Sequence, residues 1–179
     1  MDCARLDRVL FIPSAQPPHR APAMASAEDR LMMCRLAIEG EPAFEVSDVE
    51  VRRGGRSYMV DTLSALDRDH PDDELFLILG WDAARLFRTW QEPERVNAVA
   101  TVVIVARPGM EPPETSDLAA TGLDPDRVIR CIVPTPDVSA SALRRAIAAG
   151  QSVAGKVPVA VQRYLAEHHL YGDNRGVEM

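Results

Sequence analysis

Four segments rich in polar or cationic side chains each follow a short apolar run, and they hold the residues best suited to chemistry. They are Pro17-Pro18-His19-Arg20, Gly80-Trp81-Asp82, Arg107-Pro108-Gly109 and Ser139-Ala140-Ser141-Ala142-Leu143-Arg144. Guanidinium groups suit contact with phosphate or carboxylate. Hydroxyls and free N–H groups at a helix start also favour an anion. Together the four segments predict a site for a phosphate-rich ligand.

Each segment also has an ordinary structural interpretation. Ser139 could be a simple helix N-cap followed by a solvated Arg144, and Asp82 could be an N-cap as well. Trp90 and Tyr58 could be core aromatics rather than stacking partners for a ligand. Taken singly, none of these motifs decides between structure and function.

The elements that would position these residues alternate between strand and helix. Apolar runs predict strands at 8–13, 75–79, 101–106 and 127–133, and a weaker one at 44–51. Predicted helices occupy about 27–39, 57–69, 82–87, 94–99, 139–149 and 158–168, with a loop and short helix within 111–126. Ser26-Ala27-Glu28-Asp29 has the pattern of a capping box, and Ser57 is the expected cap of the second helix.

This alternation predicts an α/β fold, a doubly wound, mainly parallel sheet with helices on both faces. The runs at 75–79 and 101–106 are apolar throughout, as in strands covered on both sides. Ligands of such sheets bind beyond the carboxyl ends of the strands, so the four segments are expected to meet on one rim. With 179 residues, we expect a single domain over 1–179, with 172–179 as a flexible tail.

Composition excludes several classes of protein. A net charge of −7 disfavours a nucleic-acid-binding face, and no apolar run approaches the ~20 residues of a membrane span. The N-terminus lacks a signal-peptide layout, so we expect a cytoplasmic protein. Three widely spaced cysteines predict reduced thiols rather than zinc ligands or disulfides. The absence of GxGxxG, P-loop, GxSxG and HExxH motifs removes support for an oxidoreductase, kinase, serine hydrolase or zinc protease.

The order and spacing of the motifs are more specific than any one of them. The series runs Val9-Leu10-Phe11-Ile12-Pro13-Ser14-Ala15-Gln16-Pro17-Pro18-His19-Arg20, Ser26-Ala27-Glu28-Asp29-Arg30-Leu31-Met32-Met33, Arg53-Gly54-Gly55-Arg56-Ser57-Tyr58, Leu79-Gly80-Trp81-Asp82, Thr89-Trp90, Ala106-Arg107-Pro108-Gly109, Val138-Ser139-Ala140-Ser141-Ala142-Leu143-Arg144 and Leu170-Tyr171. From residue 6 to about residue 171 this series resembles the bacterial nicotinate-nucleotide adenylyltransferases, members of the nucleotidylyltransferase superfamily.

The resemblance implies transfer of AMP from ATP to nicotinate mononucleotide, giving deamido-NAD and pyrophosphate in NAD biosynthesis. The implied partners are ATP and nicotinate mononucleotide, with a homo-oligomer as an option and no nucleic acid or membrane. Mg²⁺ would enter with ATP, without dedicated protein ligands.

Roles for individual residues are likewise implied by the resemblance. His19 and Arg20 would be catalytic and face the triphosphate. Gly80 and Asp82 would hold the adenosine ribose. The other implied contacts are those of Ser139, Ser141 and Arg144 with the phosphates of ATP, and those of Ser57, Tyr58, Trp90 and Arg107 with the mononucleotide.

Two departures from the family pattern affect these expectations. Met59 and Gln91 stand where the family usually has a threonine and an aromatic residue, in the expected pyridine pocket. The family's first strand, its Gly-Gly-Thr-Phe-Asp-Pro loop and its His-x-Gly-His helix start have no counterpart, a segment of roughly 25 residues. We therefore expect an N-terminally incomplete domain with little or no turnover. A non-catalytic nucleotide-binding remnant and a related adenylyltransferase acting on nicotinamide mononucleotide stay open as alternatives.

Overall fold

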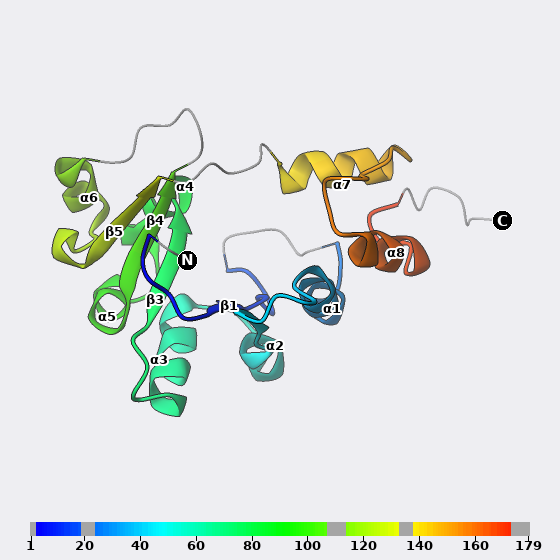
Figure 1. The fold of residues 1–179 in the computed structure, drawn as a ribbon. Helices are drawn as coiled ribbons and strands as arrows, with labels where there is room; N and C mark the ends of the chain where they lie inside the picture. Colours follow the sequence, from blue (N-terminus) through cyan, green and yellow to red (C-terminus); the bar gives the residue numbers. More distant parts are fainter. Residues whose placement is uncertain (1–2, 19–23, 107–113, 133–137, 173–179) are drawn as a thin grey trace. The chain divides into compact units, whose positions relative to one another are not determined.

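The computed structural model describes residues 3–18, 24–106, 114–132 and 138–172 of the chain (Figure 1). The chain divides into two compact units. The first unit comprises Met1–Leu6 and Ser57–Thr135, and the second comprises Asp7–Arg56 and Pro136–Met179.

A three-stranded parallel sheet forms the centre of the first unit (Figure 1). Its strands, in spatial order, are β3 (Phe76–Gly80), β4 (Thr101–Ala106) and β5 (Val128–Ile132). Both strand pairs are parallel, with Leu77 beside Val102 and Val102 beside Val128. The strands and the parallel pairing predicted from the apolar runs are confirmed.

One helix precedes these strands and the others connect them. They are α3 (Met59–Asp69), α4 (Trp81–Ala84), the 3-10 helix η1 (Phe87–Thr89), α5 (Pro93–Val99), α6 (Thr115–Thr121) and the 3-10 helix η2 (Pro125–Arg127). The single helix predicted over 82–87 is wrong, because the chain forms two short helices there. Ser57 is not the cap of α3: Tyr58 occupies the N-cap position in an extended conformation, and no side chain caps this end.

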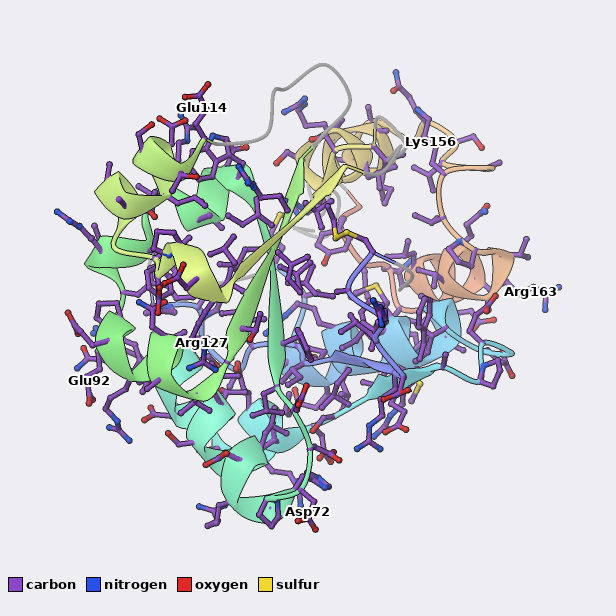
Figure 2. All side chains as sticks on the ribbon, turned by 60° about the vertical axis from the view of Figure 1, so that its left-hand side comes forward. Asp72, Glu92, Glu114, Arg127, Lys156 and Arg163 are labelled. Carbon is purple, nitrogen blue, oxygen red and sulfur yellow. A yellow bond between two sulfur atoms is a disulfide. The ribbon has the colours of Figure 1, made fainter. Side chains whose placement is uncertain are left out.

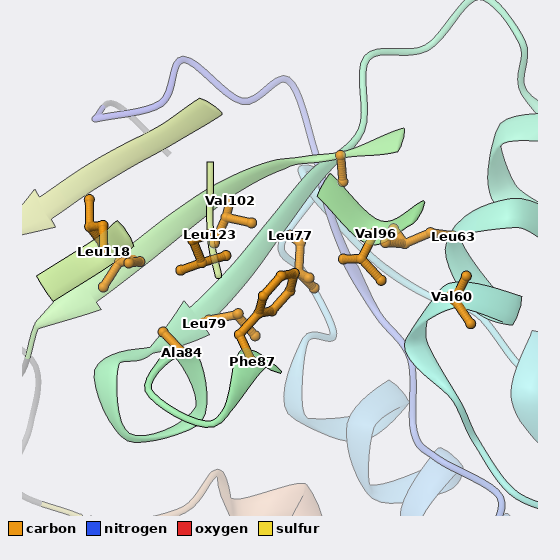
Figure 3. Close-up of a cluster of buried hydrophobic side chains, with 12 residues drawn as sticks. Val60, Leu63, Leu77, Leu79, Ala84, Phe87, Val96, Val102, Leu118 and Leu123 are labelled. Atoms are coloured by element: carbon orange, nitrogen blue, oxygen red, sulfur yellow. The ribbon is translucent and has the colours of Figure 1, made fainter. Parts of the chain in front are cut away.

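The core of the first unit lies on one face of its sheet (Figure 3). Leu77 and Leu79 of β3 and Val102 and Ile104 of β4 point to this face, since alternate residues of a strand share a side. The remaining members come from the surrounding helices and loops and are Val60, Leu63, Ala84, Phe87, Val96, Ala100, Leu118 and Leu123. Burial of each large apolar side chain stabilises the fold by about 1.5–3 kcal/mol.

The opposite face of this sheet is only partly covered. Val103 in β4 is 3% exposed, whereas its neighbour Ile78 in β3 is 43% exposed. The prediction of two covered faces therefore holds for β4 and is wrong for β3. Within the described residues β3 has a strand partner on one edge only, so fewer neighbouring side chains shield Ile78.

Two cysteines contradict the prediction of reduced thiols. Cys3 and Cys131 form a disulfide with their Cα atoms 5.9 Å apart, although 128 positions separate them in sequence. Spacing along the chain carried no signal for this pair, because the fold alone brings the N-terminal segment to the end of β5. Cys34 is a free thiol, and burial raises its pKa.

Charged side chains lie on the outside of the first unit, where Figure 2 shows Asp72, Glu92 and Glu114. Arg127 instead donates hydrogen bonds to the carbonyls of Asn97 at 2.6 Å and Ala98 at 2.7 Å, at the end of α5. A cation at this position satisfies carbonyls that a helix terminus leaves free. No helix in the described parts of the chain is long and apolar enough to cross a membrane.

In the part of the chain that the structure describes, the second unit contains a two-stranded parallel sheet and four helices. The strands are β1 (Val9–Phe11) and β2 (Phe44–Val46). The helices are α1 (Ala27–Ala37), α2 (Val49–Arg53), α7 (Ala140–Ala148) and α8 (Val159–Glu167). The strand predicted over 44–51 ends at Val46, because the chain turns at Asp48 into α2, where Arg52 pairs with the Asp48 carboxylate at 2.8 Å.

The start of α1 is fixed by side-chain hydrogen bonds. Ser26 and Asp29 form the predicted capping box. Tyr164 of α8 donates to Asp29 Oδ1 at 2.9 Å and stacks on His168, with ring centroids 4.1 Å apart. These contacts attach α8 to the first turn of α1.

Candidate active site

Three of the predicted site residues, His19, Arg20 and Arg107, lie outside the described residues. The others fall into two groups, one in each unit. Ser57, Tyr58, Gly80, Asp82 and Trp90 belong to the first unit, and Ser139, Ser141 and Arg144 to the second.

Gly80 and Asp82 lie where β3 passes into α4. Gly80 is both the last residue of β3 and the N-cap of α4. A Cβ at Gly80 would meet no described atom within 4 Å, so the backbone is open to close approach by a ligand. Asp82 forms an exposed ion pair with Arg85 at 2.9 Å. Such a surface pair contributes only about 0–1 kcal/mol, so the carboxylate can exchange it for a ligand hydroxyl at small cost.

Trp90 and Tyr58 lie against the buried cluster of the first unit. Trp90 follows η1, and its ring centroid is 5.3 Å from that of the fully buried Phe87. Both Trp90 and Tyr58 are half-buried. Each ring is therefore held by the core and still has an exposed part. A role in the core and a role in stacking on a ligand are thus compatible for both rings.

The start of α7 gathers the polar groups predicted to bind phosphates. Ser139 is the N-cap, as predicted, and its Oγ accepts from the N–H of Ala142 at 3.4 Å. Arg144 Nη2 donates to Ser141 Oγ at 3.3 Å. Because these side chains are exposed, hydroxyls, a guanidinium and free helix N–H groups are all available to an anion.

Residues that the sequence did not single out as functional lie near this cluster. Tyr171, which follows α8, is half-buried, and burial raises its pKa while the charges of Arg144 and Arg30 oppose the shift. Arg30 hydrogen-bonds the segment that follows β1. Sequence periodicity carried no signal for either residue, because their contacts join segments far apart in the chain.

The arrangement defines a class of protein. A parallel α/β fold with an open glycine and a carboxylate after one strand, and a hydroxyl-capped helix with an arginine, is typical of nucleotide-binding enzymes. Among the described residues, no group of three or more histidine, cysteine or carboxylate side chains could hold a metal ion.

Comparison with known proteins identifies the family. Residues 2–146 match the cytidylyltransferase-like family model. The chain is 45% identical to the probable nicotinate-nucleotide adenylyltransferase of Thermus thermophilus, covering 93% of this chain and 84% of the relative. It is 39% identical to the protein of the same description from Thermomicrobium roseum, over 93% of this chain and 78% of the relative. The chain therefore belongs to the cytidylyltransferase-like family and, within it, to the nicotinate-nucleotide adenylyltransferases.

A solved structure supports the fold. The nicotinic acid mononucleotide adenylyltransferase of Plasmodium falciparum, complexed with NaAD, matches with a TM-score of 0.70. The match covers 92% of this chain and 82% of that chain at 14% identity. The predicted fold class is confirmed.

Proposed function

We propose that this protein transfers AMP from ATP to nicotinate mononucleotide, forming deamido-NAD and pyrophosphate. The observation that carries the proposal is the 38–45% identity to proteins described as nicotinate-nucleotide adenylyltransferases, which extends over 93–97% of the chain. Since the substrates are NAD precursors, we further propose that the protein acts in the cytoplasm.

In the proposed reaction a phosphate oxygen of the mononucleotide attacks the α-phosphorus of ATP. A new P–O bond forms as the bond between the α-phosphorus and its bridging oxygen breaks, and pyrophosphate leaves with that oxygen. No covalent enzyme intermediate is needed, so catalysis consists of positioning and charge stabilisation. Mg²⁺ enters as part of the MgATP substrate.

The phosphates are the proposed ligands of the second unit. Ser139 and Ser141 would donate hydroxyl hydrogen bonds, and Arg144 would exchange its contact with Ser141 for a phosphate oxygen. Arg20 would add positive charge to the triphosphate, and His19 would contact it or donate a proton. Arginine suits this role because its planar fork of donors matches phosphate oxygens.

The nucleoside parts are the proposed ligands of the first unit. The Gly80 backbone and the Asp82 carboxylate would hold the adenosine ribose. Trp90 would stack on the pyridine ring, with Tyr58 and Ser57 near the nicotinate carboxylate. Arg107 would bind on the mononucleotide side. We further propose that residues 1–179 form a single nucleotidyltransferase-like domain.

The test is pyrophosphate release with MgATP and nicotinate mononucleotide. Turnover by the native chain would support the proposed function and would overturn the expectation, drawn from the sequence, of little or no activity. Arg144→Gln should raise the KM for ATP or lower kcat by at least about tenfold, since a charge-assisted contact is worth roughly 1.5–3 kcal/mol. Arg145→Gln, which removes the neighbouring exposed guanidinium on α7, is the matched control. Equal losses in both variants would contradict the assignment of Arg144.

Two further measurements separate the alternatives. Turnover with nicotinamide mononucleotide tests for an enzyme that acts on the amide. If the protein prefers nicotinamide mononucleotide to nicotinate mononucleotide, the amide replaces the acid as the proposed substrate. Calorimetry distinguishes a non-catalytic remnant, which would bind deamido-NAD without binding ATP. Turnover with the acid, together with ATP binding, supports the proposed function.

A further inference from the structure

The disulfide between Cys3 and Cys131 lies at the carboxyl end of the sheet in the first unit. Cys131 is the penultimate residue of β5 and pairs with Val105 of β4, which pairs in turn with Gly80 of β3. These three residues form one row across the sheet, and residues of one row in parallel strands point to the same face. The disulfide is therefore on the face to which a side chain at Gly80 would point.

This face is well covered over β4 and β5 and less covered over β3. Cys131 is 5% exposed and Val103 is 3% exposed, whereas Ile78 is 43% exposed. Gly80 is exposed as well. The N-terminal segment 3–6 belongs to the first unit, and its bond to Cys131 attaches it to the covered side of the face.

A ligand at Gly80 would lie beside this segment. Ligands of open α/β sheets bind beyond the carboxyl ends of the strands, and a Cβ at Gly80 would meet no described atom within 4 Å. Neighbouring strands are about 4.8 Å apart, so the Cα atoms of Gly80 and Cys131 are separated by about 10 Å. A ligand that extends from Gly80 along the row, past β4, therefore meets the bonded segment.

The two sulfur atoms differ in access, and this determines how the bond can be opened. Cys3 is exposed, whereas Cys131 is buried, so a thiolate of a dithiol reductant would attack Cys3 Sγ. The S–S bond breaks, and the Cys131 sulfur leaves with the electron pair and takes a proton from water. The second thiol of the reductant then displaces Cys3, so the protein gains two electrons and two protons and the reductant becomes a disulfide. Oxidised glutathione reverses the reaction and is reduced to two molecules of glutathione.

We propose that Cys3 and Cys131 form a reversible redox site that controls nucleotide binding at the carboxyl end of this sheet. The closed disulfide keeps the N-terminal segment beside the row that ends at Gly80 and restricts the space for the ligand. Reduction releases the segment, and ATP binds more tightly. The inference rests on the proposed function, which supplies ATP as the ligand. In the cytoplasm, the proposed location, disulfides are usually transient and catalytic or redox-sensing.

The test compares the native protein after treatment with dithiothreitol and after treatment with oxidised glutathione. Peptide mass spectrometry should find Cys3 joined to Cys131 in the oxidised form only. Calorimetry should show that ATP binds the reduced form at least about fivefold more tightly, which is the lower end of ordinary coupling between two sites. Equal affinities, tighter binding by the oxidised form, or failure of the two cysteines to join would overturn the inference.

Two serine variants separate this disulfide from other effects of the redox treatment. Cys3→Ser removes an exposed sulfur, so the variant should fold, and under both conditions it should bind ATP as the reduced native protein does. Cys34→Ser, the matched control, removes the free thiol and should keep the native response. The inference is wrong if Cys3→Ser still responds to oxidation or if Cys34→Ser no longer does.

A reciprocal measurement gives a readout that a purely structural disulfide would not change. If reduction tightens ATP binding by some factor, saturating ATP must shift the thiol–disulfide equilibrium towards the thiols by the same factor. At a fixed concentration of reduced glutathione, half-oxidation should therefore need at least about fivefold more oxidised glutathione when ATP is present. An unchanged midpoint, or loss of the circular dichroism spectrum on reduction, would mean a purely structural disulfide and would contradict the inference.

Failure of the proposed function can be recognised separately. If the two redox forms bind ATP with different affinities but neither transfers AMP, the proposed function is wrong and the inference stands. If both forms bind ATP equally and release pyrophosphate, the proposed function stands and the inference is wrong. If neither form binds ATP, both are overturned.

Discussion

The hydrogen bond between Asp29 and Tyr164 joins residues 135 positions apart and gives a direct test of how the second unit is held together. A double-mutant cycle of Tyr164→Phe, Asp29→Ala and the double variant isolates the energy of this one contact. A hydrogen bond to a charged group contributes about 1.5–3 kcal/mol. Because the pair is half-buried and Ser26 still donates to Asp29, we expect a coupling energy of about 1–2 kcal/mol at pH 7.

Acid should weaken this coupling. The hydrogen bonds from Ser26 and Tyr164 hold the pKa of Asp29 below its ordinary value of 3.8. The unfolded chain then takes up a proton first as the pH falls, so the stabilisation is complete above pH 3.8 and is lost as the pH falls through the folded-state pKa. A bond to a neutral carboxyl is roughly half as strong, so the coupling energy should fall to about half.

The assay is urea unfolding, followed by circular dichroism from pH 7 down to pH 2. Tyr164→Phe keeps the ring that stacks on His168, so the variant tests the hydroxyl alone. A coupling energy below about 0.3 kcal/mol at pH 7, which is the usual scatter of additive sites, would refute the role of this hydrogen bond. A coupling energy that does not change with pH would refute the role of the carboxylate charge.

Three further substitutions test other parts of the fold. Gly122→Ala should destabilise by about 1–2 kcal/mol, because Gly122 has a φ of +84° and the new Cβ would lie 2.7 Å from Arg88 Cγ; an unchanged urea midpoint would contradict this. Phe87→Ala removes a side chain that is 0% exposed and should cost about 3–5 kcal/mol, with tryptophan emission moving to longer wavelength as Trp90 loses its neighbour; native emission would argue against the contact. His169→Gly should stabilise by about 0.5–1 kcal/mol, because His169 has a φ of +51° after α8; a lower thermal midpoint would count against this reasoning.

The sequence predicted those helices and strands that are determined by residues close together in the chain. Ser26 and Asp29 define the start of α1 within four residues, and Ser139 does the same for α7. The apolar runs of β3 and β4 were recognisable because every side chain of a central strand tends to be buried. Ile78 departs from this pattern, since its exposure depends on which elements cover β3 rather than on β3 itself.

Features that depend on distant parts of the chain could not be predicted in this way. The pairing of Cys3 with Cys131 and the contact of Arg30 with Ala15 both follow from the tertiary fold. The end of β2 at Val46 is a closer case: the alternation slips at Ser47-Asp48 before it resumes at Val49, and the chain turns into α2 at this slip. For the site, the sequence correctly predicted that a helix starts at Ser139. That the predicted site residues bind one ligand together stays a prediction.

The disulfide has a consequence for how the chain can be cut. Cys3 and Cys131 close a covalent ring that contains every residue between them. A protease that cleaves a single peptide bond inside this ring adds one water and releases nothing, so the nicked protein keeps its mass apart from that water. Two fragments separate on a gel only after a reductant opens the ring, whereas a cut beyond residue 131 releases its fragment at once.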